Sequence, residues 1–289
     1  MNVRVALAQI NTKLGQVEAN LNKHLEYIQA AKDDGADIVV FPELSLTGYV
    51  LQDLATTVAI HPGHPTTAFE KLLDASKEID ILFGFVEEDQ RNRFFISSAY
   101  LSAGKILHIH RKVYLPTYGL FDEGRFFAWG DDIKAFDTKF GRFGMLICED
   151  FWHASPPYLL WLDGADVFFL VSSSPGRGIT NDGEVGTSRW VDHINRAYAS
   201  LFTSYVVHSN RVGYEDGLHF WGGASAYDPN GTQIVRANST DECLVIADLD
   251  LNQLHRTRAR LPLLRDERTG LVSRCMNEIL SQDGKESGR

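Results

Sequence analysis

The segment Phe140-Gly-Arg-Phe-Gly-Met-Leu-Ile-Cys-Glu-Asp-Phe-Trp152 carries the clearest indication of fold in this chain. Its apolar run from Phe143 to Ile147 is typical of a strand that is buried on both faces of a sheet. The run ends at Cys148, which two acidic residues follow at once. Because ligands bind at the carboxyl ends of strands in open α/β sheets, Cys148 is a candidate nucleophile. The alternative interpretation is a small apolar side chain of the core, since free cysteine is often buried.

Strand and helix patterns alternate along the rest of the chain and divide it into two comparable halves. The first half predicts strands over 3–10, 36–41, 79–86, 94–101 and 106–110, with helices over 21–33 and 67–78. The second half predicts strands over 133–138, 143–147, 165–171, 202–208 and three short strands within 221–248, with helices over 155–163 and 187–200. These patterns predict an α/β fold in which the halves pair their sheets and the helices lie outside.

The length of the chain permits one large domain or two smaller ones. We expect a single domain over 1–250, because strands and helices recur in both halves without a linker between them. The extension over 251–289 alternates charged and apolar residues. Such a tail is expected to dock on the domain or on a second subunit, so we predict a homodimer or a higher even oligomer.

Composition excludes several classes of protein. A net charge of −10 and a pI near 5.4 make nucleic acid or an anionic membrane surface an unsuitable partner. The three cysteines, Cys148, Cys243 and Cys275, are too widely spaced for a disulfide framework or a Cys-x-x-Cys metal site. The first residues lead directly into a strand pattern and no apolar run is of membrane-spanning length, so we expect a cytoplasmic protein.

Three chemically complementary side chains follow three predicted strands: Glu43, Lys112 and Cys148. A thiol that attacks a carbonyl or nitrile carbon needs a base to take its proton and a cation to stabilise the oxyanion that forms. A carboxylate, an ammonium and a thiol provide these functions without a metal or another cofactor. Each residue alone would be unremarkable at the end of a strand, and the set of three indicates an enzyme.

Other chemistries find less support in the sequence. His108 and His110 lie two residues apart on one strand and could bind a metal if a third ligand approached, but they could equally be polar residues of a half-exposed strand. No Gly-x-Gly-x-x-Gly or phosphate-binding lysine loop is present. The serines at 172–174 lack the flanking glycines of a serine nucleophile elbow.

Three segments together resemble the signature motifs of the nitrilase, or carbon-nitrogen hydrolase, superfamily. They match in order and in residue type, and a fourth segment resembles the C-terminal motif of that family. The segments are Phe41-Pro-Glu-Leu-Ser-Leu-Thr-Gly-Tyr49, His110-Arg-Lys-Val-Tyr-Leu-Pro116, Leu146-Ile-Cys-Glu-Asp150 and Leu261-Pro-Leu-Leu-Arg-Asp-Glu-Arg268. The resemblance implies a four-layer αββα sandwich of the nitrilase type that dimerises, with no cofactor.

The resemblance also implies roles for individual residues. Glu43 would be the general base, Lys112 would stabilise the oxyanion, and Cys148 would be the nucleophile. Glu123 matches a second glutamate that members of the family place beside the lysine. This residue lies in an aromatic loop over 114–131 that is long enough to be functional in itself.

Within the superfamily, the motifs are most similar to the glutaminase domain of glutamine-dependent NAD synthetase. This similarity places Tyr118, Glu149 and Ser174 where that branch contacts its amide substrate. The sequence shows no Ser-Gly-Gly loop of an ATP-using synthetase domain before Arg289, which favours a free-standing amidase. Nitrilases usually carry tryptophan after the cysteine, so Glu149 at that position favours an amide over a nitrile.

The expected function is therefore hydrolysis of a small linear carboxamide to an acid and ammonia through a cysteine thioester. The alternatives are an N-carbamoyl amidohydrolase, a glutaminase-type subunit that supplies ammonia, a nitrilase, and a catalytically silent scaffold of the same fold. Substrate specificity is expected to lie in the loops over 114–131 and 172–186.

Overall fold

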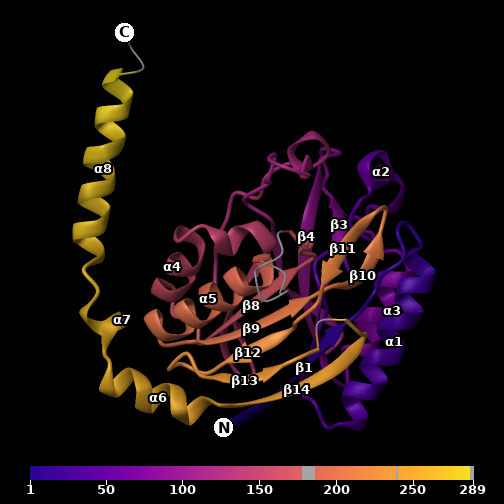
Figure 1. Ribbon diagram of the computed structural model, residues 1–289, viewed down its shortest axis with the longest axis horizontal. Helices are drawn as coiled ribbons and strands as arrows, with labels where there is room; N and C mark the ends of the chain where they lie inside the picture. The colour runs from indigo at the N-terminus through magenta and orange to yellow at the C-terminus, as the bar shows by residue number, and fades with distance from the viewer. Residues whose placement is uncertain (178–185, 239, 287–289) are drawn as a thin grey trace.

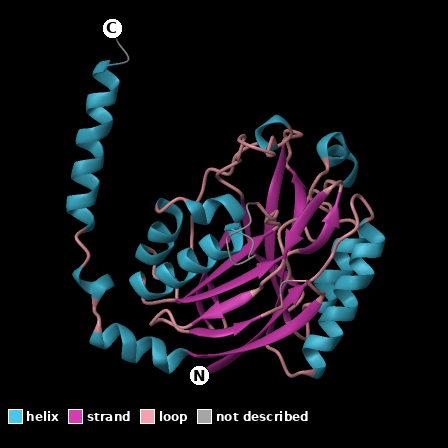
Figure 2. Ribbon diagram, viewed as in Figure 1, coloured by secondary structure: helices cyan, strands magenta, loops and turns pink. Residues whose placement is uncertain are grey.

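Two six-stranded sheets pack face to face, and helices cover the outer face of each (Figures 1 and 2). This arrangement is seen in a computed structural model that describes residues 1–177, 186–238 and 240–286. The α/β class, the pairing of the two sheets and the outer position of the helices agree with the prediction from the sequence.

The first sheet has the order β14-β1-β2-β3-β4-β5. Strands β1, β2 and β3 run parallel, and the other neighbours pair antiparallel. The strands are β1 (Asn2–Gln9), β2 (Ile38–Val40), β3 (Asp80–Glu88), β4 (Phe94–Ser102), β5 (Lys105–Arg111) and β14 (Cys243–Asp250). The helices of this half are α1 (Val17–Asp33), α2 (Ala55–Val58) and α3 (Thr67–Ala75).

The second sheet has the order β13-β12-β9-β8-β7-β6, with β7, β8 and β9 parallel. Its strands are β6 (Phe136–Thr138), β7 (Gly141–Ile147), β8 (Val167–Ser172), β9 (Tyr205–Asn210), β12 (Ser225–Tyr227) and β13 (Gln233–Arg236). The helices α4 (Ser155–Leu162) and α5 (Gly186–Leu201) belong to this half. Both sheets thus have three parallel strands at their centre, which agrees with the expected similarity of the two halves.

One hairpin was not predicted from the sequence. Strands β10 (Val212–Glu215) and β11 (Leu218–Trp221) pair antiparallel around a two-residue turn. The turn is Asp216-Gly217, with φ of +48° and +79°. An Asp-Gly pair between two short strands is typical of a tight hairpin turn, so the signal was present but the flanking runs are only four residues long.

The apolar core has three layers. The middle layer lies between the sheets and includes Leu7, Phe143 and Phe169. The outer layers fill the space between each sheet and its helices, for example around Phe69 on α3 and Trp161 on α4. Strands with apolar side chains on both faces are therefore enclosed on both sides, which explains the continuous apolar runs in the sequence.

The C-terminal extension leaves the domain in two stages. Helix α6 (Leu251–Arg260) buries Leu254 against the domain, and its Arg258 donates to the side chain of Asp166 at 2.7 Å. After the short helix α7 (Leu263–Asp266), helix α8 (Thr269–Glu286) points away from the sheets (Figure 1). Docking of α8 on a second subunit stays a prediction.

In the described part of the chain, no helix combines the length and the apolar character needed to cross a membrane.

Candidate active site

Three strand ends deliver the predicted residues to one place. Glu43 lies three residues after β2, Lys112 follows β5 directly, and Cys148 follows β7 directly. Glu43 and Lys112 are each 1% exposed, and Cys148 is 7% exposed. The turn that carries Glu43 packs closely on β3, where a Cβ atom at Gly84 would lie 2.8 Å from the carbonyl carbon of Glu43. A glycine at position 84 is therefore what lets this turn reach the site.

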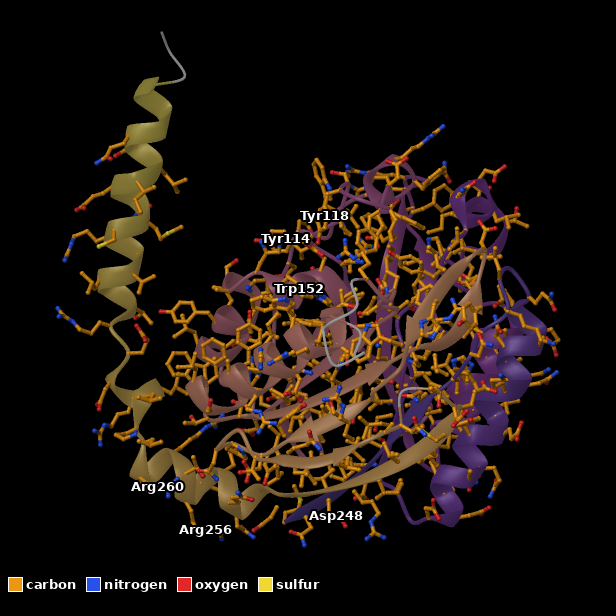
Figure 3. The ribbon with its side chains drawn as sticks, viewed as in Figure 1. Tyr114, Tyr118, Trp152, Asp248, Arg256 and Arg260 are labelled. Carbon is orange, nitrogen blue, oxygen red and sulfur yellow. The ribbon has the colours of Figure 1, made fainter. Side chains whose placement is uncertain are left out.

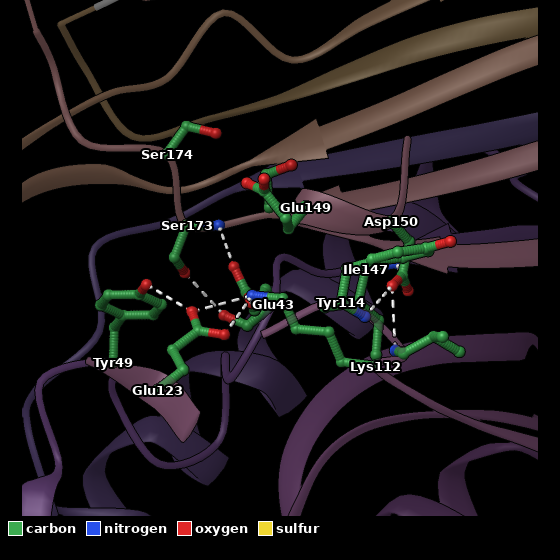
Figure 4. A network of polar contacts seen from close by, with 12 residues as sticks. Glu43, Tyr49, Lys112, Tyr114, Glu123, Ile147, Glu149, Asp150, Ser173 and Ser174 are labelled. Carbon is green, nitrogen blue, oxygen red and sulfur yellow. Dashed lines mark hydrogen bonds and ion pairs between the residues drawn. The ribbon is translucent and has the colours of Figure 1, made fainter. Parts of the chain in front are cut away.

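Lys112 is held between two carboxylates, as Figure 4 shows. Its Nζ lies 2.8 Å from Oε1 of Glu43 and 2.8 Å from both carboxylate oxygens of Glu123. The second oxygen of Glu43 accepts a hydrogen bond from the backbone N–H of Ser173 at 2.8 Å. The hydroxyl of Ser173 donates to the backbone carbonyl of Glu43 at 2.8 Å. These contacts fix the carboxylate of Glu43 from two sides.

Burial and the neighbouring charges shift the pKa values of Glu123 and Lys112. Burial raises the pKa of Glu123 to about 7, against the opposing effect of Lys112. Burial also acts to lower the pKa of Lys112, but the carboxylates of Glu123 and Glu43 outweigh it and hold that pKa well above its usual value. Glu43 and Glu123 share one ammonium, and the carboxyl group of the buried Glu123 therefore keeps its proton to higher pH than a solvated one would.

The thiol of Cys148 is protonated in this environment. Burial and the negative charge of Glu43 raise the pKa of Cys148 well above its usual value, although Lys112 acts in the opposite direction. A thiol of this kind does not ionise spontaneously near neutral pH, so nucleophilic attack requires a neighbouring base.

The turn at Cys148 is anchored by a buried carboxylate that the sequence interpretation did not single out. Cys148 has φ of +47°, a backbone conformation that residues other than glycine rarely adopt. Asp150, which is fully buried, accepts the backbone N–H groups of Val113 and Tyr114 at 2.9 and 3.0 Å and that of Ile147 at 3.0 Å. Its second oxygen also lies 2.8 Å from Nε2 of His110. Asp150 therefore ties the cysteine turn to the end of the lysine strand.

Replacing Asp150 by asparagine is expected to lower the free energy of unfolding by about 3 kcal/mol and to reduce turnover. The new NH₂ group cannot accept hydrogen bonds, so at least one buried backbone N–H loses its partner. Urea denaturation measures the stability. Asp89→Asn is the matched control, because Asp89 also accepts the backbone N–H groups of a turn, at Arg91 and Arg93, but near the surface. Stability equal to that of the wild-type protein in Asp150→Asn would contradict the anchoring role.

The residues predicted to contact substrate are linked to the strand-end residues: Glu149 directly follows Cys148, and Ser174 directly follows Ser173, whose backbone N–H binds Glu43. Figure 3 shows Tyr118 at the surface, and its hydroxyl donates to both carboxylate oxygens of Glu149, at 3.1 and 3.0 Å. Ser174 is 7% exposed, and its backbone N–H donates to Oδ1 of Asn210. The guanidinium of Arg177 lies 5.6 Å from the ring centre of Tyr118. Of the two predicted specificity loops, 114–131 is described throughout, and residues 178–185 of the second lie outside the described residues.

His108 and His110, the two possible metal ligands, each contact another side chain in the structure. His110 contacts Asp150, and His108 stacks on the ring of Phe136 at 4.5 Å between centres. Residues 1–177, 186–238 and 240–286 contain no group of three or more His, Cys, Asp or Glu side chains that could hold a metal ion. The third ligand that the metal hypothesis required is therefore missing from the described residues.

The fold and the strand-end residues define a class of protein. A family model described as carbon-nitrogen hydrolase matches residues 4–259, and the chain belongs to this family, within the nitrilase superfamily. The chain is an enzyme of the carbon-nitrogen hydrolase type. This agrees with the family that the sequence motifs indicated.

Three individual proteins of this superfamily are similar to most of the chain. The glutamine-dependent NAD(+) synthetase of Thermotoga maritima is 31% identical over 258 residues, which cover 87% of this chain and 42% of that protein. The glutamine-dependent NAD+ synthetase of Acinetobacter baumannii, solved in complex with ADP, has a TM-score of 0.78 at 31% identity and covers 88% of this chain and 47% of that one. Saccharomyces cerevisiae Nit3, a member of branch 10 of the nitrilase superfamily, has a TM-score of 0.78 at 25% identity, with 91% and 95% of the two chains covered. The chain spans less than half the length of the NAD synthetases it matches.

Proposed function

We propose that the chain is a thiol hydrolase that cleaves the C–N bond of a small linear carboxamide to give an acid and ammonia. One observation carries this proposal: a buried lysine bridges two carboxylates, and a buried thiol lies near enough for the charges of Lys112 and Glu43 to act on its pKa. A protonated thiol, a base and a fixed cation are what acyl transfer through sulfur requires.

The first half of the proposed reaction forms a thioester. Glu43 takes the proton of the Cys148 thiol as the sulfur attacks the amide carbon. The ammonium of Lys112 and the backbone N–H of Glu149 stabilise the oxyanion of the tetrahedral intermediate. Glu43 then gives its proton to the amide nitrogen, the C–N bond breaks, and ammonia leaves.

The second half restores the enzyme. Glu43 takes a proton from water, the hydroxide attacks the thioester carbon, and the C–S bond breaks. The thiolate recovers the proton, and the acid product leaves. Throughout the cycle, the contacts of Glu123 with the ammonium of Lys112 keep that cation in place.

The proposal also concerns which amide the enzyme cleaves. The relatives at 31% identity are glutamine-dependent NAD synthetases, so the side-chain amide of glutamine is the second candidate substrate, with the chain as an ammonia-supplying glutaminase. Tyr118, Glu149 and Ser174 are the proposed substrate contacts. In support of this, the hydroxyl of Tyr118 contacts the carboxylate of Glu149, the residue next to Cys148. N-carbamoyl compounds and nitriles are the remaining alternatives.

A substrate panel tests the proposal. The panel holds simple aliphatic amides, glutamine, N-carbamoyl amino acids and nitriles, with ammonia release as the readout and the Cys148→Ala variant as the blank for each compound. We expect release from carboxamides, with one mole of acid for each mole of ammonia. Carbon dioxide in the products would instead identify an N-carbamoyl amidohydrolase. If the wild-type protein cleaves no compound of the panel, the chain is a scaffold.

A further inference from the structure

Tyr49 has no role in the proposed mechanism, but its side chain contacts the buried cluster of Glu43, Lys112, Glu123 and Cys148 through Glu123. Its hydroxyl donates to Oε1 of Glu123 at 2.6 Å. The same oxygen accepts a hydrogen bond from Nζ of Lys112 at 2.8 Å. Figure 4 shows the ring of Tyr49 and the ammonium of Lys112 on either side of the Glu123 carboxylate. The carboxylate of Glu123 is therefore bound from two sides, by a phenol and by an ammonium.

The ring and backbone of Tyr49 are held in place by the β10–β11 hairpin. The ring meets that of Phe220 edge to face, with 5.8 Å between centres. The backbone N–H groups of Tyr49 and Val50 both donate to Oε1 of Glu215, at 2.8 and 2.7 Å. Since two consecutive N–H groups share one acceptor, the backbone at Tyr49 has little freedom to move the hydroxyl away from Glu123.

Glu215 is itself fixed by a buried cation. Its second oxygen lies 2.7 Å from Nη1 of Arg211, which is fully buried. The guanidinium of Arg211 lies 4.4 Å from the ring centre of Phe220 and donates to the backbone carbonyl of Thr12 at 2.9 Å. A buried ion pair with further hydrogen bonds has a well-defined geometry. Gly48, with φ of +84°, leaves room for this carboxylate, since a Cβ atom there would lie 2.9 Å from Oε2 of Glu215.

We infer that Tyr49 is a positioning residue of the reaction: its hydroxyl holds the carboxylate of Glu123 ionised and in contact with Lys112. This inference rests on the proposed function, because it gives Tyr49 a role only through Lys112 and Glu123. The hairpin that holds Tyr49 is a structural support of the site although it contributes no side chain to the Lys112 contacts.

The physical reason is the effect of a hydrogen-bond donor on a carboxylate. A donor binds the ionised form better than the protonated form, so it lowers the pKa of the carboxyl group. Burial already raises the pKa of Glu123 to about 7. Loss of the Tyr49 hydroxyl removes one donor and raises this pKa further. A larger fraction of molecules then carries a neutral Glu123, which holds the ammonium of Lys112 less strongly.

Tyr49→Phe tests the inference, because the phenylalanine ring keeps the contact with Phe220 and removes only the hydroxyl. Tyr100→Phe is the matched control: Tyr100 is also buried and also donates to a carboxylate, that of Asp80, at 2.9 Å. Asp80 keeps the hydroxyl of Ser102 and the ammonium of Lys139 as partners in this control. The probe is iodoacetamide, and alkylation of Cys148 is followed by peptide mass spectrometry over a pH series that spans the pKa of Glu123.

For the wild-type protein, we expect the alkylation rate of Cys148 to show an inflection near pH 7, where Glu123 titrates. In Tyr49→Phe, this inflection is expected to move to higher pH by about one unit, and turnover of a cleaved amide is expected to fall on the order of tenfold. Tyr100→Phe is expected to keep the wild-type profile. A profile of Tyr49→Phe that coincides with the wild-type profile, or a wild-type profile without the inflection, overturns the inference. A wild-type protein that releases no ammonia from any compound of the substrate panel would instead refute the proposed function.

Discussion

Replacing Cys148 by alanine is expected to lower amide hydrolysis by roughly 10³-fold or more, because no thioester can form without the sulfur. The other two thiols cannot substitute for it: Cys243 begins β14 and pairs with Gln9, and Cys275 is exposed on α8. The measurement is ammonia release from whichever amide the substrate panel identifies. The variant is expected to fold normally, since alanine is smaller than cysteine and adds no polar group.

Cys275→Ala is the matched control for this prediction. It removes a thiol from the same chain at a site far from the cluster and is expected to leave turnover unchanged. Ammonia release by Cys148→Ala at a rate comparable with that of Cys275→Ala would refute the nucleophile role. Thermal unfolding of both variants shows that any loss of activity does not come from loss of fold.

Replacing Glu43 by glutamine is expected to lower turnover by roughly 10²- to 10⁴-fold, the usual contribution of a general base. The substitution preserves the shape of the side chain and removes the proton acceptor. Because burial and Glu43 raise the pKa of the Cys148 thiol well above its usual value, the proposed mechanism requires a base at position 43 to activate the thiol. The amide of glutamine would also place an NH₂ group toward either the ammonium of Lys112 or the N–H of Ser173, which now donate to the carboxylate. Steady-state ammonia release is the measurement.

Asp80→Asn is the control for the loss of a buried carboxylate as such. Asp80 is 1% exposed and accepts hydrogen bonds from Tyr100, Ser102 and Lys139, away from the thiol. This variant is expected to be less stable but to keep the turnover of each folded molecule. Turnover of Glu43→Gln within tenfold of the wild-type rate would be incompatible with a base at this position.

The strand-end residues were accessible from the sequence because each depends on a local pattern. Cys148 follows directly on the buried strand β7, and Lys112 follows directly on the partly exposed strand β5. The pattern of each run and the residue after it therefore suffice to place them. Glu43 was found in the same way, after Ala36-Asp-Ile-Val-Val-Phe41. Glu123 was identified only by its match to the family motif, since nothing in the sequence of the aromatic loop indicates that this residue is buried.

The supporting residues were missed for a physical reason. Asp150 could have been noticed as an acid two residues after the cysteine, but its partners lie near Lys112, 36 and 37 residues earlier in the chain. Ser173 contacts Glu43 across 130 residues, and Glu215 contacts Tyr49 across 166 residues. Hydrogen bonds over such separations leave no periodic trace in a single sequence.

From the sequence alone came the α/β class, the two similar halves, and an acid, an ammonium and a thiol at the ends of three strands. These features follow from the alternation of apolar and polar residues and from covalent neighbours, which are local. Only the tertiary structure determined that one lysine lies between two carboxylates, that burial raises the pKa of Glu123 to about 7, and that Asp150 anchors the cysteine turn. Proton affinity and hydrogen bonding depend on burial and on distance between side chains, and both arise only when the two sheets have packed together.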